Sequence, residues 1–589
     1  MRRGEWLNLN GVWDFEIDHL DRLRPDDFQR RPLSSSILVP FPPEAPLSGV
    51  DPALAKRDIR AVWYRREVTV PASWIGRHLL LHLQASDYDT TVWIDGEFVG
   101  MHRGGFTPID IDISETVGDR TTFTLLVRAR DAMGAPKPSG KQTHKLDGYE
   151  AYYSRITGIW QTVWIEPVTA THLGRPRITP DVPQSSFQID LPLSSHVRHA
   201  QVSVELRSEN RVIATSTVEV RHQDRAEIHI QVPADEVRHW SPDAPHLYDL
   251  RFTLELEDGT RDTVDSYAGL RSIQIDGVRV LLNGEPVFQR LVLDQGWYPE
   301  GLLTAPSDDA LVRDIELAKS AGFNGARLHE KVFEERYLYH ADRLGFLVWG
   351  EFPDWGVRVR NRQLPPATIF TQWSEAIERD YSHPSIVGWC PLNETFERLD
   401  DAPNVLDDVT VGLYRLTKAL DGTRPVIDAS GYSHRVYGAD IYDSHNYEQD
   451  PETFAQQMSG LGRGEPFVNV GPGGVVWSVP YAGQPYFCSE FGGVWWDEGE
   501  RDLHGSWGYG ARPRSVEEWF DRVSGLMGVL LDDPNMFGYC FTQLTDVFQE
   551  RNGVYTFDRR PKLDPDRLRA VQQRPAAIEA PVLTISNII

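Results

Sequence analysis

After about residue 280 the chain alternates short apolar runs with amphipathic segments of helical period, and this alternation limits the fold more than any other feature. One helical segment carries its own start and stop signals, with Ser307 as the cap, Asp308 and Asp309 in the first turn and Gly322 at the end. The other predicted helices are Glu334–Leu344, Thr371–Tyr381, Val405–Leu420 and Val516–Leu531. The predicted strands are Val287–Leu293, Asn324–His329, Phe346–Phe352, Ile386–Asn393, Pro425–Ser430, Tyr442–Asn446, Tyr486–Glu490 and Met536–Gln543.

Eight strands with intervening helices over about 300 residues are typical of a (β/α)8 TIM barrel. A doubly wound sheet would also alternate strands and helices, but no GxGxxG turn follows the first run. The glycine-rich Gly471–Gly474 lies instead in a long loop between the sixth and seventh runs. We therefore predict a C-terminal barrel over residues 276–589.

The part before the barrel is rich in strand patterns. Residues 1–169 contain short runs of Val, Ile, Thr, Trp and Tyr, and the turn pair Asp95-Gly96 joins two of them, which predicts a β-sandwich. Residues 170–275 contain six or seven alternating runs, a number typical of an immunoglobulin-like β-sandwich. These runs are Phe187–Leu191, Ala200–Arg207, Arg211–Val220, Ala226–Val232, Tyr248–Leu256 and Thr263–Ile275.

Composition excludes several classes of function. The formal net charge is −26, so binding to nucleic acid or to an anionic membrane is disfavoured. No run of 18 uncharged apolar residues occurs and no apolar segment follows the basic N-terminus, so we expect a cytoplasmic protein. The three cysteines are too few for a disulfide framework. Whether the chain forms a homo-oligomer stays open.

Polar residues end the apolar runs of the predicted barrel, where the active site of such a fold lies. Most are carboxylates, and they come with no lysine, no serine–histidine pairing and no phosphate loop. This equipment indicates acid/base or carboxylate-nucleophile chemistry, as glycoside cleavage requires. The residues at strand ends are Asp294, Arg327, His329, Glu330, Glu351, Asp354, Asn393, Glu394, Asp428, His445, Asn446, Tyr447, Glu490, Gln543 and Asp546.

Two of these strand ends carry recognisable motifs. Gly388–Glu394 (GWCPLNE) and Ser489–Gly493 (SEFGG) resemble the acid/base and nucleophile motifs of glycoside hydrolase family 2, the family of β-galactosidases, β-glucuronidases and β-mannosidases. The resemblance covers almost the whole chain. It extends to Leu7–Phe15, Val92–Thr107, Thr157–Pro167 and Leu282–Pro286. It implies a jelly-roll-like, sugar-binding sandwich at the N-terminus, the immunoglobulin-like sandwich in the middle and the catalytic barrel.

The resemblance also implies roles for single residues. Glu394 would be the acid/base and Glu490 the nucleophile, Asn393 would bind the sugar 2-hydroxyl, and Tyr447 would orient the nucleophile. His329 matches a histidine that lines the family's site. Further predicted substrate contacts, from strand ends and from an aromatic pair after Gly493, are His445, Asn446, Asp294, Glu351, Gln543 and Trp496.

We expect no cofactor and no metal ion. His329 and Glu330 begin the sequence HEKVF, which lacks the second histidine of a zinc-protease motif. Double displacement needs only two carboxyl groups, about 5–5.5 Å apart. The charge of Glu490 is expected to raise the pKa of Glu394 and keep it protonated as the general acid.

The sequence thus predicts a retaining exo-β-glycosidase that acts on a carbohydrate substrate. Between Phe548 and Lys562 it has no Asn-x-Lys, the element by which β-glucuronidases of the family hold the substrate carboxylate. This absence disfavours a β-glucuronide. We therefore expect a β-D-galactoside or an α-L-arabinopyranoside first, a β-glucuronide next and a β-mannoside third. Two alternatives stay open: a noncatalytic carbohydrate-binding protein on the same scaffold, and a transglycosidase.

Overall fold

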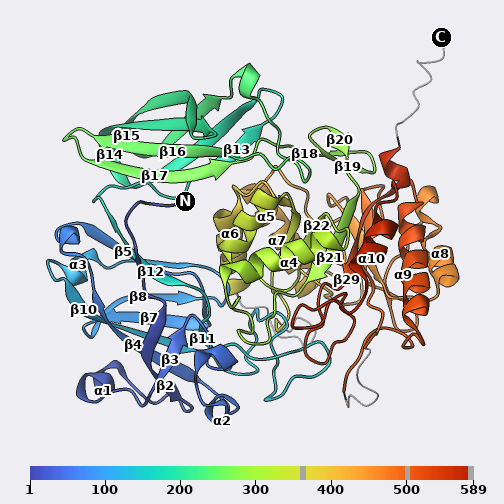
Figure 1. Cartoon of the computed structure of the whole chain (residues 1–589), viewed down its shortest axis with the longest axis horizontal. Helices are drawn as coiled ribbons and strands as arrows, with labels where there is room; N and C mark the ends of the chain where they lie inside the picture. Colours follow the sequence, from blue (N-terminus) through green and yellow to red (C-terminus); the bar gives the residue numbers. More distant parts are fainter. Residues whose placement is uncertain (358–366, 498–504, 581–589) are drawn as a thin grey trace.

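The computed structural model describes residues 1–357, 367–497 and 505–580. Two β-rich bodies lie on one side of the molecule and a larger α/β body on the other (Figure 1). This is the predicted fold class, a jelly-roll-like sandwich and an immunoglobulin-like sandwich followed by a TIM barrel.

The first sandwich consists of two antiparallel sheets around one apolar core. Its hairpin turn forms as predicted, with positive φ at Asp95 (50°) and Gly96 (88°). One sheet has the order β1 (Leu7–Asn8), β12 (Val163–Val168), β5 (His78–Leu83), β9 (Ile109–Asp112). The other has the order β3 (Ser35–Val39), β2 (Gly11–Asp18), β4 (Ala61–Thr69), β10 (Thr122–Arg130), β7 (Asp89–Ile94), β8 (Glu97–Arg103).

The second sandwich is built around one long hairpin. Four of the predicted strands merge into β14 (Ser186–Ser208) and β15 (Arg211–Gln231), which pair along their length with a register shift between Pro192 and Val197. The alternating pattern predicted separate strands because it does not distinguish a bend within a strand from a turn. The sheet is completed by β13 (Arg177–Asp181), β16 (Tyr248–Leu256) and β17 (Arg261–Ala268), and residues from both halves of the hairpin share one core.

The barrel contains a curved parallel sheet of seven strands. Residues 426–430 take the fifth position without forming a regular strand, and parallel bridges join them to Trp389, Asn393 and Ile441 on either side. The order along the sheet is β24 (Ile386–Cys390), β23 (Leu347–Glu351), β22 (Gly325–Leu328), β21 (Gln289–Asp294), β29 (Met536–Thr542), β28 (Tyr486–Gly492), β25 (Tyr442–Asn446).

Helices alternate with these strands. Ser307 caps α4 by accepting a hydrogen bond from the backbone N–H of Ala310. The sequence pattern missed α8 and α10, because each spans only eight residues. The helices of the barrel are α4 (Asp308–Ser320), α5 (Glu335–Leu344), α6 (Thr368–Asp380), α7 (Val405–Leu420), α8 (Pro451–Met458), α9 (Val516–Leu531) and α10 (Pro565–Gln572).

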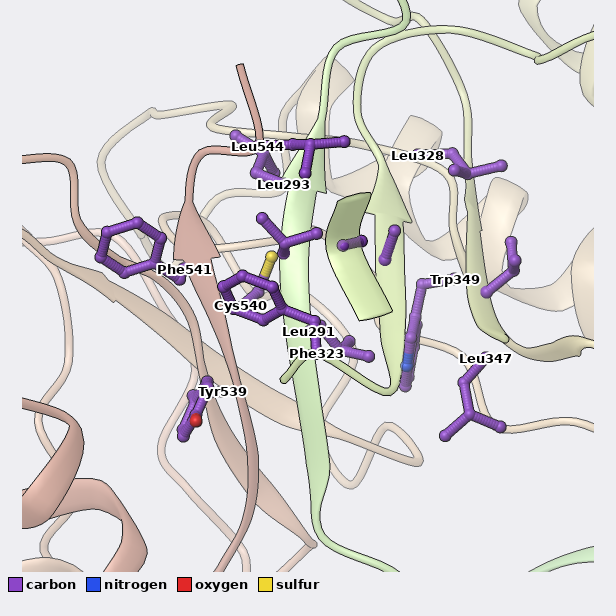
Figure 2. Close-up of a cluster of buried hydrophobic side chains, with 14 of the residues drawn as sticks. Leu291, Leu293, Phe323, Leu328, Leu347, Trp349, Tyr539, Cys540, Phe541 and Leu544 are labelled. Atoms are coloured by element: carbon purple, nitrogen blue, oxygen red, sulfur yellow. The ribbon is translucent and has the colours of Figure 1, made fainter. Parts of the chain in front are cut away.

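Apolar side chains from several barrel strands fill its core, as Figure 2 shows for Leu291, Trp349 and Cys540. All three cysteines are buried and unpaired, and burial raises the pKa of the Cys540 thiol well above its ordinary value. They act as small apolar fillers. Within the described residues no helix has the length and apolar character needed to cross a membrane.

A buried histidine holds the fifth and sixth positions of the barrel together. His434 Nδ1 lies 2.7 Å from Asp428 Oδ1, and its Nε2 lies 3.1 Å from Asp443 Oδ1. Burial lowers the pKa of His434, but the two carboxylates outweigh burial and raise that pKa to about 10. The imidazolium is therefore part of the folded structure at neutral pH.

We predict that His434→Gln destabilises the protein more at pH 6 than at pH 10. The folded pKa lies above the ordinary histidine value of about 6.5, so the stabilisation is complete below that pH and is lost as the pH rises toward 10. Its size is on the order of a few kcal/mol. Thermal unfolding at both pH values measures the difference, with exposed His229→Gln as the control. An equal loss at both pH values would contradict the charged state of His434.

Candidate active site

Two glutamates face each other at the C-terminal ends of the barrel strands. Glu490 belongs to β28, and Glu394 follows β24 with a left-handed φ of 49°, a sparsely populated conformation that is often found at functional sites. One carboxylate oxygen of each, together with a ring nitrogen of His445, lie within 4.8 Å of one another. The two carboxyl groups therefore lie close enough to act on the same bond.

Arg327 organises the side chains around this pair. Its guanidinium is fully buried, and it donates to Glu490 Oε1 at 3.0 Å, to Asn393 Oδ1 at 2.5 Å and to Glu351. The hydrogen bond from Arg327 to Asn393 Oδ1 fixes the orientation of the Asn393 amide and leaves its nitrogen, Nδ2, available as a donor. In the described part of the chain this buried Nδ2 has no hydrogen-bond partner, so it is a free donor beside the two glutamates.

Glu351 is fully buried and pairs with both Arg327 and His329. Its Oε1 lies 2.9 Å from His329 Nδ1 and accepts a hydrogen bond from the backbone N–H of Glu330. Burial opposes its ionisation, but Arg327 and His329 lower the pKa of Glu351 to about 2. Both oxygens are occupied, so Glu351 supports the site and does not face a substrate.

Tyr447 holds the other oxygen of Glu490. Its hydroxyl donates to Glu490 Oε2 at 2.5 Å and lies 3.0 Å from Thr542 Oγ1. Burial and the charge of Glu490 raise the pKa of Tyr447 well above its ordinary value, so the hydroxyl keeps its proton. The ring stacks on Tyr509, with centroids 3.5 Å apart.

His445 links the two glutamates to a buried polar chain. Its Nδ1 lies 2.9 Å from Glu394 Oε1 and 3.5 Å from Glu490 Oε2. Its Nε2 lies 3.0 Å from Ser430 Oγ, which in turn donates to Asp443 at 2.8 Å. Burial lowers the pKa of His445, but Glu490 and Glu394 outweigh burial and raise it.

The pKa of Glu394 is lowered in the structure, opposite to the expected direction. Burial raises the pKa of Glu394, as expected, but the hydrogen bond and the charge of His445 outweigh burial and lower that pKa to about 2. The sequence indicates the repulsion from Glu490 but not the contact with His445, which depends on the fold. The same two glutamates raise the pKa of His445, so the contact favours the proton on His445 over the proton on Glu394.

A segment of the first sandwich completes the mouth of the barrel. We call residues 137–156 the arm. Backbone N–H groups of Ser139 and Gly140 donate to the loop after β23, and Gln549, after β29, donates to the carbonyl oxygen of Glu150 at 2.6 Å. The conformation depends on Gly140, where φ is +56° and a Cβ would come within 2.2 Å of the Glu330 carbonyl oxygen. The arm thus spans the mouth from one barrel loop to another.

The arm brings a lysine to the site. Lys141 is buried, and its ammonium lies 3.6 Å from the centroid of the Trp355 ring, whose Nε1 donates to the Asn393 carbonyl oxygen. Its charge helps to lower the pKa of Glu394. Within the ranges that the structure describes, the side chain of Lys141 forms no hydrogen bond and no ion pair.

A second chain of polar contacts comes from the segment after β29. Glu550 accepts hydrogen bonds from Tyr153 of the arm at 2.6 Å and from Asn552 at 3.1 Å, and Gln543 donates to Asn552 at 2.7 Å. Burial raises the pKa of Glu550 above its ordinary value, although the charge of Lys141 opposes this shift. Glu550 lies where the sequence lacks Asn-x-Lys.

Six predicted site residues gather here, and five take other places. Those brought together are Glu394, Glu490, Asn393, Tyr447, His445 and His329. Asn446 donates to Gln457 of α8, because successive strand residues point to opposite faces. Asp294 accepts from Gly296, and Gln543 supports Asn552. The guanidinium of Arg512 lies 5.8 Å from the centroid of the Trp496 ring. Glu351 binds Arg327 and His329, as described above.

The strand-end rule missed the residues that do not end a barrel strand. Lys141 and Tyr153 come from another domain, and no periodic pattern marks them. Trp355 and Glu550 lie a few residues beyond their strands. The spacing of Glu394, His445 and Glu490 would also suit a metal ion. His445 Nδ1 already lies at hydrogen-bond distance from Glu394 Oε1.

Comparisons with known proteins agree with this architecture. Profiles described as "Glycosyl hydrolases family 2, sugar binding domain", "Glycosyl hydrolases family 2" and "Glycosyl hydrolases family 2, TIM barrel domain" match residues 7–130, 171–271 and 304–468. Among solved structures, a β-glucuronidase from Lactobacillus rhamnosus superimposes with a TM-score of 0.79 at 20% identity over 98% of both chains.

Relatives in sequence carry two activities in their names. A β-glucuronidase from Paenibacillus borealis is 26% identical over 72% of both chains. A β-galactosidase from Thermoanaerobacter pseudethanolicus is 26% identical over 71% of this chain and 55% of its own. With three family-2 profiles in chain order and paired glutamates at the strand ends where the motifs put them, the chain belongs to glycoside hydrolase family 2 and is a glycoside hydrolase.

Proposed function

We propose that the protein is a retaining exo-β-glycosidase. The observation that carries this proposal is the short distance between Glu394 and Glu490, which lie within 4.8 Å through their nearest oxygens. Retaining enzymes keep their carboxyl groups about 5–5.5 Å apart, whereas inverting enzymes leave about 6.5–9.5 Å for a water. The arm across the barrel mouth favours attack at a chain end over attack at an internal unit.

Each side chain has a task in double displacement. Glu490 attacks the anomeric carbon, with Arg327 and Tyr447 holding its two oxygens in place. Glu394 protonates the departing oxygen and later takes a proton from water. The free Nδ2 of Asn393 is the donor for the sugar 2-hydroxyl, an interaction that strengthens in the transition state.

We infer that Glu394 and His445 together form the acid. The proton lies on His445 before the reaction, 2.9 Å from Glu394, and passes through Glu394 to the leaving group. When Glu394 removes a proton from water in the second step, His445 takes it back. The pair therefore begins and ends each turnover with the same charge.

Substitution of each glutamate should separate the two roles. Glu490→Ala should be nearly inactive on every substrate. Glu394→Ala should still release dinitrophenol in a burst from a dinitrophenyl glycoside. General-acid catalysis accelerates cleavage roughly 10²–10⁴-fold, but a good leaving group departs without it. Added azide should then accelerate the slow second step and give the β-glycosyl azide. A burst from Glu490→Ala instead would reverse the assignment.

The pH profile of kcat/KM tests the role of His445. In the wild type, activity should fall on the alkaline side as the pair loses its proton, at the raised pKa of His445. In His445→Asn the proton must sit on Glu394, so the alkaline limb should move to lower pH. An unchanged alkaline limb would show that His445 does not supply the proton.

The sugar is the finer part of the proposal, and a β-D-glucuronide is now better supported than the galactoside favoured by the sequence. Several relatives are named β-glucuronidases, and Lys141 offers a buried cation without an ion-pair partner in the described residues. A sugar carboxylate that is buried without such a cation costs several kcal/mol. Arg155 is not available, because it binds Asp131.

One observation keeps a β-galactoside as the second candidate. Glu550 places a carboxyl group near Lys141, and a carboxylate there would repel a uronate but accept hydrogen bonds from sugar hydroxyls. The β-galactosidase relative agrees with this alternative. A direct comparison of the two sugars decides between them.

If the substrate is a glucuronide, Lys141→Met should lower kcat/KM on an aryl β-glucuronide about 30-fold or more, because a charge pair is lost from a buried site. The same variant should change kcat/KM on the matched galactoside less than about threefold. Lys145→Met is the control, since this exposed lysine of the arm also lies over a tyrosine ring. A wild type that prefers the galactoside, with no effect of Lys141→Met, would favour the second candidate.

A further inference from the structure

We propose that Phe396, Tyr432 and Trp477 form a binding surface for a flat, apolar leaving group of the substrate. We call these three residues the aromatic platform. The proposal rests on the proposed function, because a leaving group exists only if the chain cleaves glycosides. It adds a region for the leaving group to the part of the site that would bind the sugar.

The platform lies on the side of the acid. Phe396 follows Glu394 by two residues, and the Tyr432 hydroxyl hydrogen-bonds to the Glu394 carboxylate. The Tyr432 ring also lies 5.5 Å from the ring of His445. In double displacement the nucleophile and the leaving group stand on opposite faces of the anomeric carbon. A group that leaves beside Glu394 therefore departs over these aromatic rings.

The rings pack against one another and not only against the barrel. The centroid of the Trp477 ring lies 5.2 Å from that of Phe396, with 26° between the ring planes, and 5.3 Å from that of Tyr432. Gly471 leaves room for the indole of Trp477, because a Cβ at this position would come within 2.7 Å of the indole Nε1. All three side chains are half-buried, so part of each remains accessible. Stacked rings of this kind bind other flat groups well.

Hydrogen bonds hold the platform in a fixed place. Trp477 follows the hairpin of β26 (Val470–Gly471) and β27 (Val475–Val476). Leu399, after the fourth strand, donates to the carbonyl oxygen of Val476 at 2.9 Å. Ser478 donates to the carbonyl oxygen of Tyr432 at 2.5 Å. The surface is therefore formed before a substrate binds, which reduces the entropic cost of binding.

The same hairpin is apolar where it meets solvent. Val470, Val475 and Val476 are 52%, 37% and 52% exposed. Exposed apolar residues that gather beside a catalytic site commonly mark a ligand-binding surface. Valine offers no hydrogen bonds to a second sugar, so the hairpin favours an aromatic, apolar leaving group over a carbohydrate.

The test uses three glycosides of the sugar that the wild type cleaves best: the phenyl glycoside, the 2-naphthyl glycoside and a disaccharide. The two aryl leaving groups have similar acidity but different size. Trp477→Ala should lower kcat/KM about tenfold on the naphthyl glycoside, less on the phenyl glycoside, and little on the disaccharide. Trp477→Phe should restore most of the loss.

Two controls separate binding from damage to the site. The leaving group has gone before the second step, so Trp477→Ala should not change kcat for substrates whose second step is rate-limiting. Val476→Ser should weaken the naphthyl preference about two- to threefold, whereas Val212→Ser, at an exposed valine of the second sandwich, should not.

Three results would overturn the platform. These are equal losses on all three glycosides, no loss on any of them, and a larger loss on the disaccharide, which would indicate a subsite for a second sugar. A wild type that cleaves no β-glycoside would instead overturn the proposed function, and the platform with it.

Discussion

The site depends on one buried cation. Arg327 is fully buried, and its guanidinium connects Glu351, Asn393 and Glu490. Each of these polar groups would be costly to bury without its partner. Since the four residues belong to or adjoin β22, β23, β24 and β28, a single side chain holds the ends of four strand positions in one arrangement. Glu490, Asn393 and Glu351 therefore cannot move independently.

The first sandwich is part of the active site and not an appendage. Its arm carries Lys141 to Trp355 and Tyr153 to Glu550, and Gly140 allows the close approach to the barrel. In the proposed function, the barrel supplies the groups that make and break bonds, and the arm supplies groups that can recognise the sugar. Specificity in this chain can therefore change through a loop of another domain while the barrel stays the same.

The sequence predicted the parts of the site that follow from local periodicity. Glu394 and Glu490 lie close together in the structure because polar residues that end parallel strands meet at one mouth. Asn446 donates to Gln457 of α8, because the same rule does not say which neighbour points inward. Lys141 was not predicted, since contacts between domains leave no periodic signal. The charge of His445 was also missed, because a pKa depends on distances that only the fold provides.

Covalent trapping of the nucleophile tests the account most directly. A 2-deoxy-2-fluoro glycoside with a good leaving group slows the second step of a retaining enzyme, so the sugar should accumulate on the protein as an ester. Mass analysis of the digested enzyme should find one sugar per chain on the peptide that contains Glu490. An ester on another carboxylate, or a product of inverted configuration without any trapped sugar, would contradict the central claim.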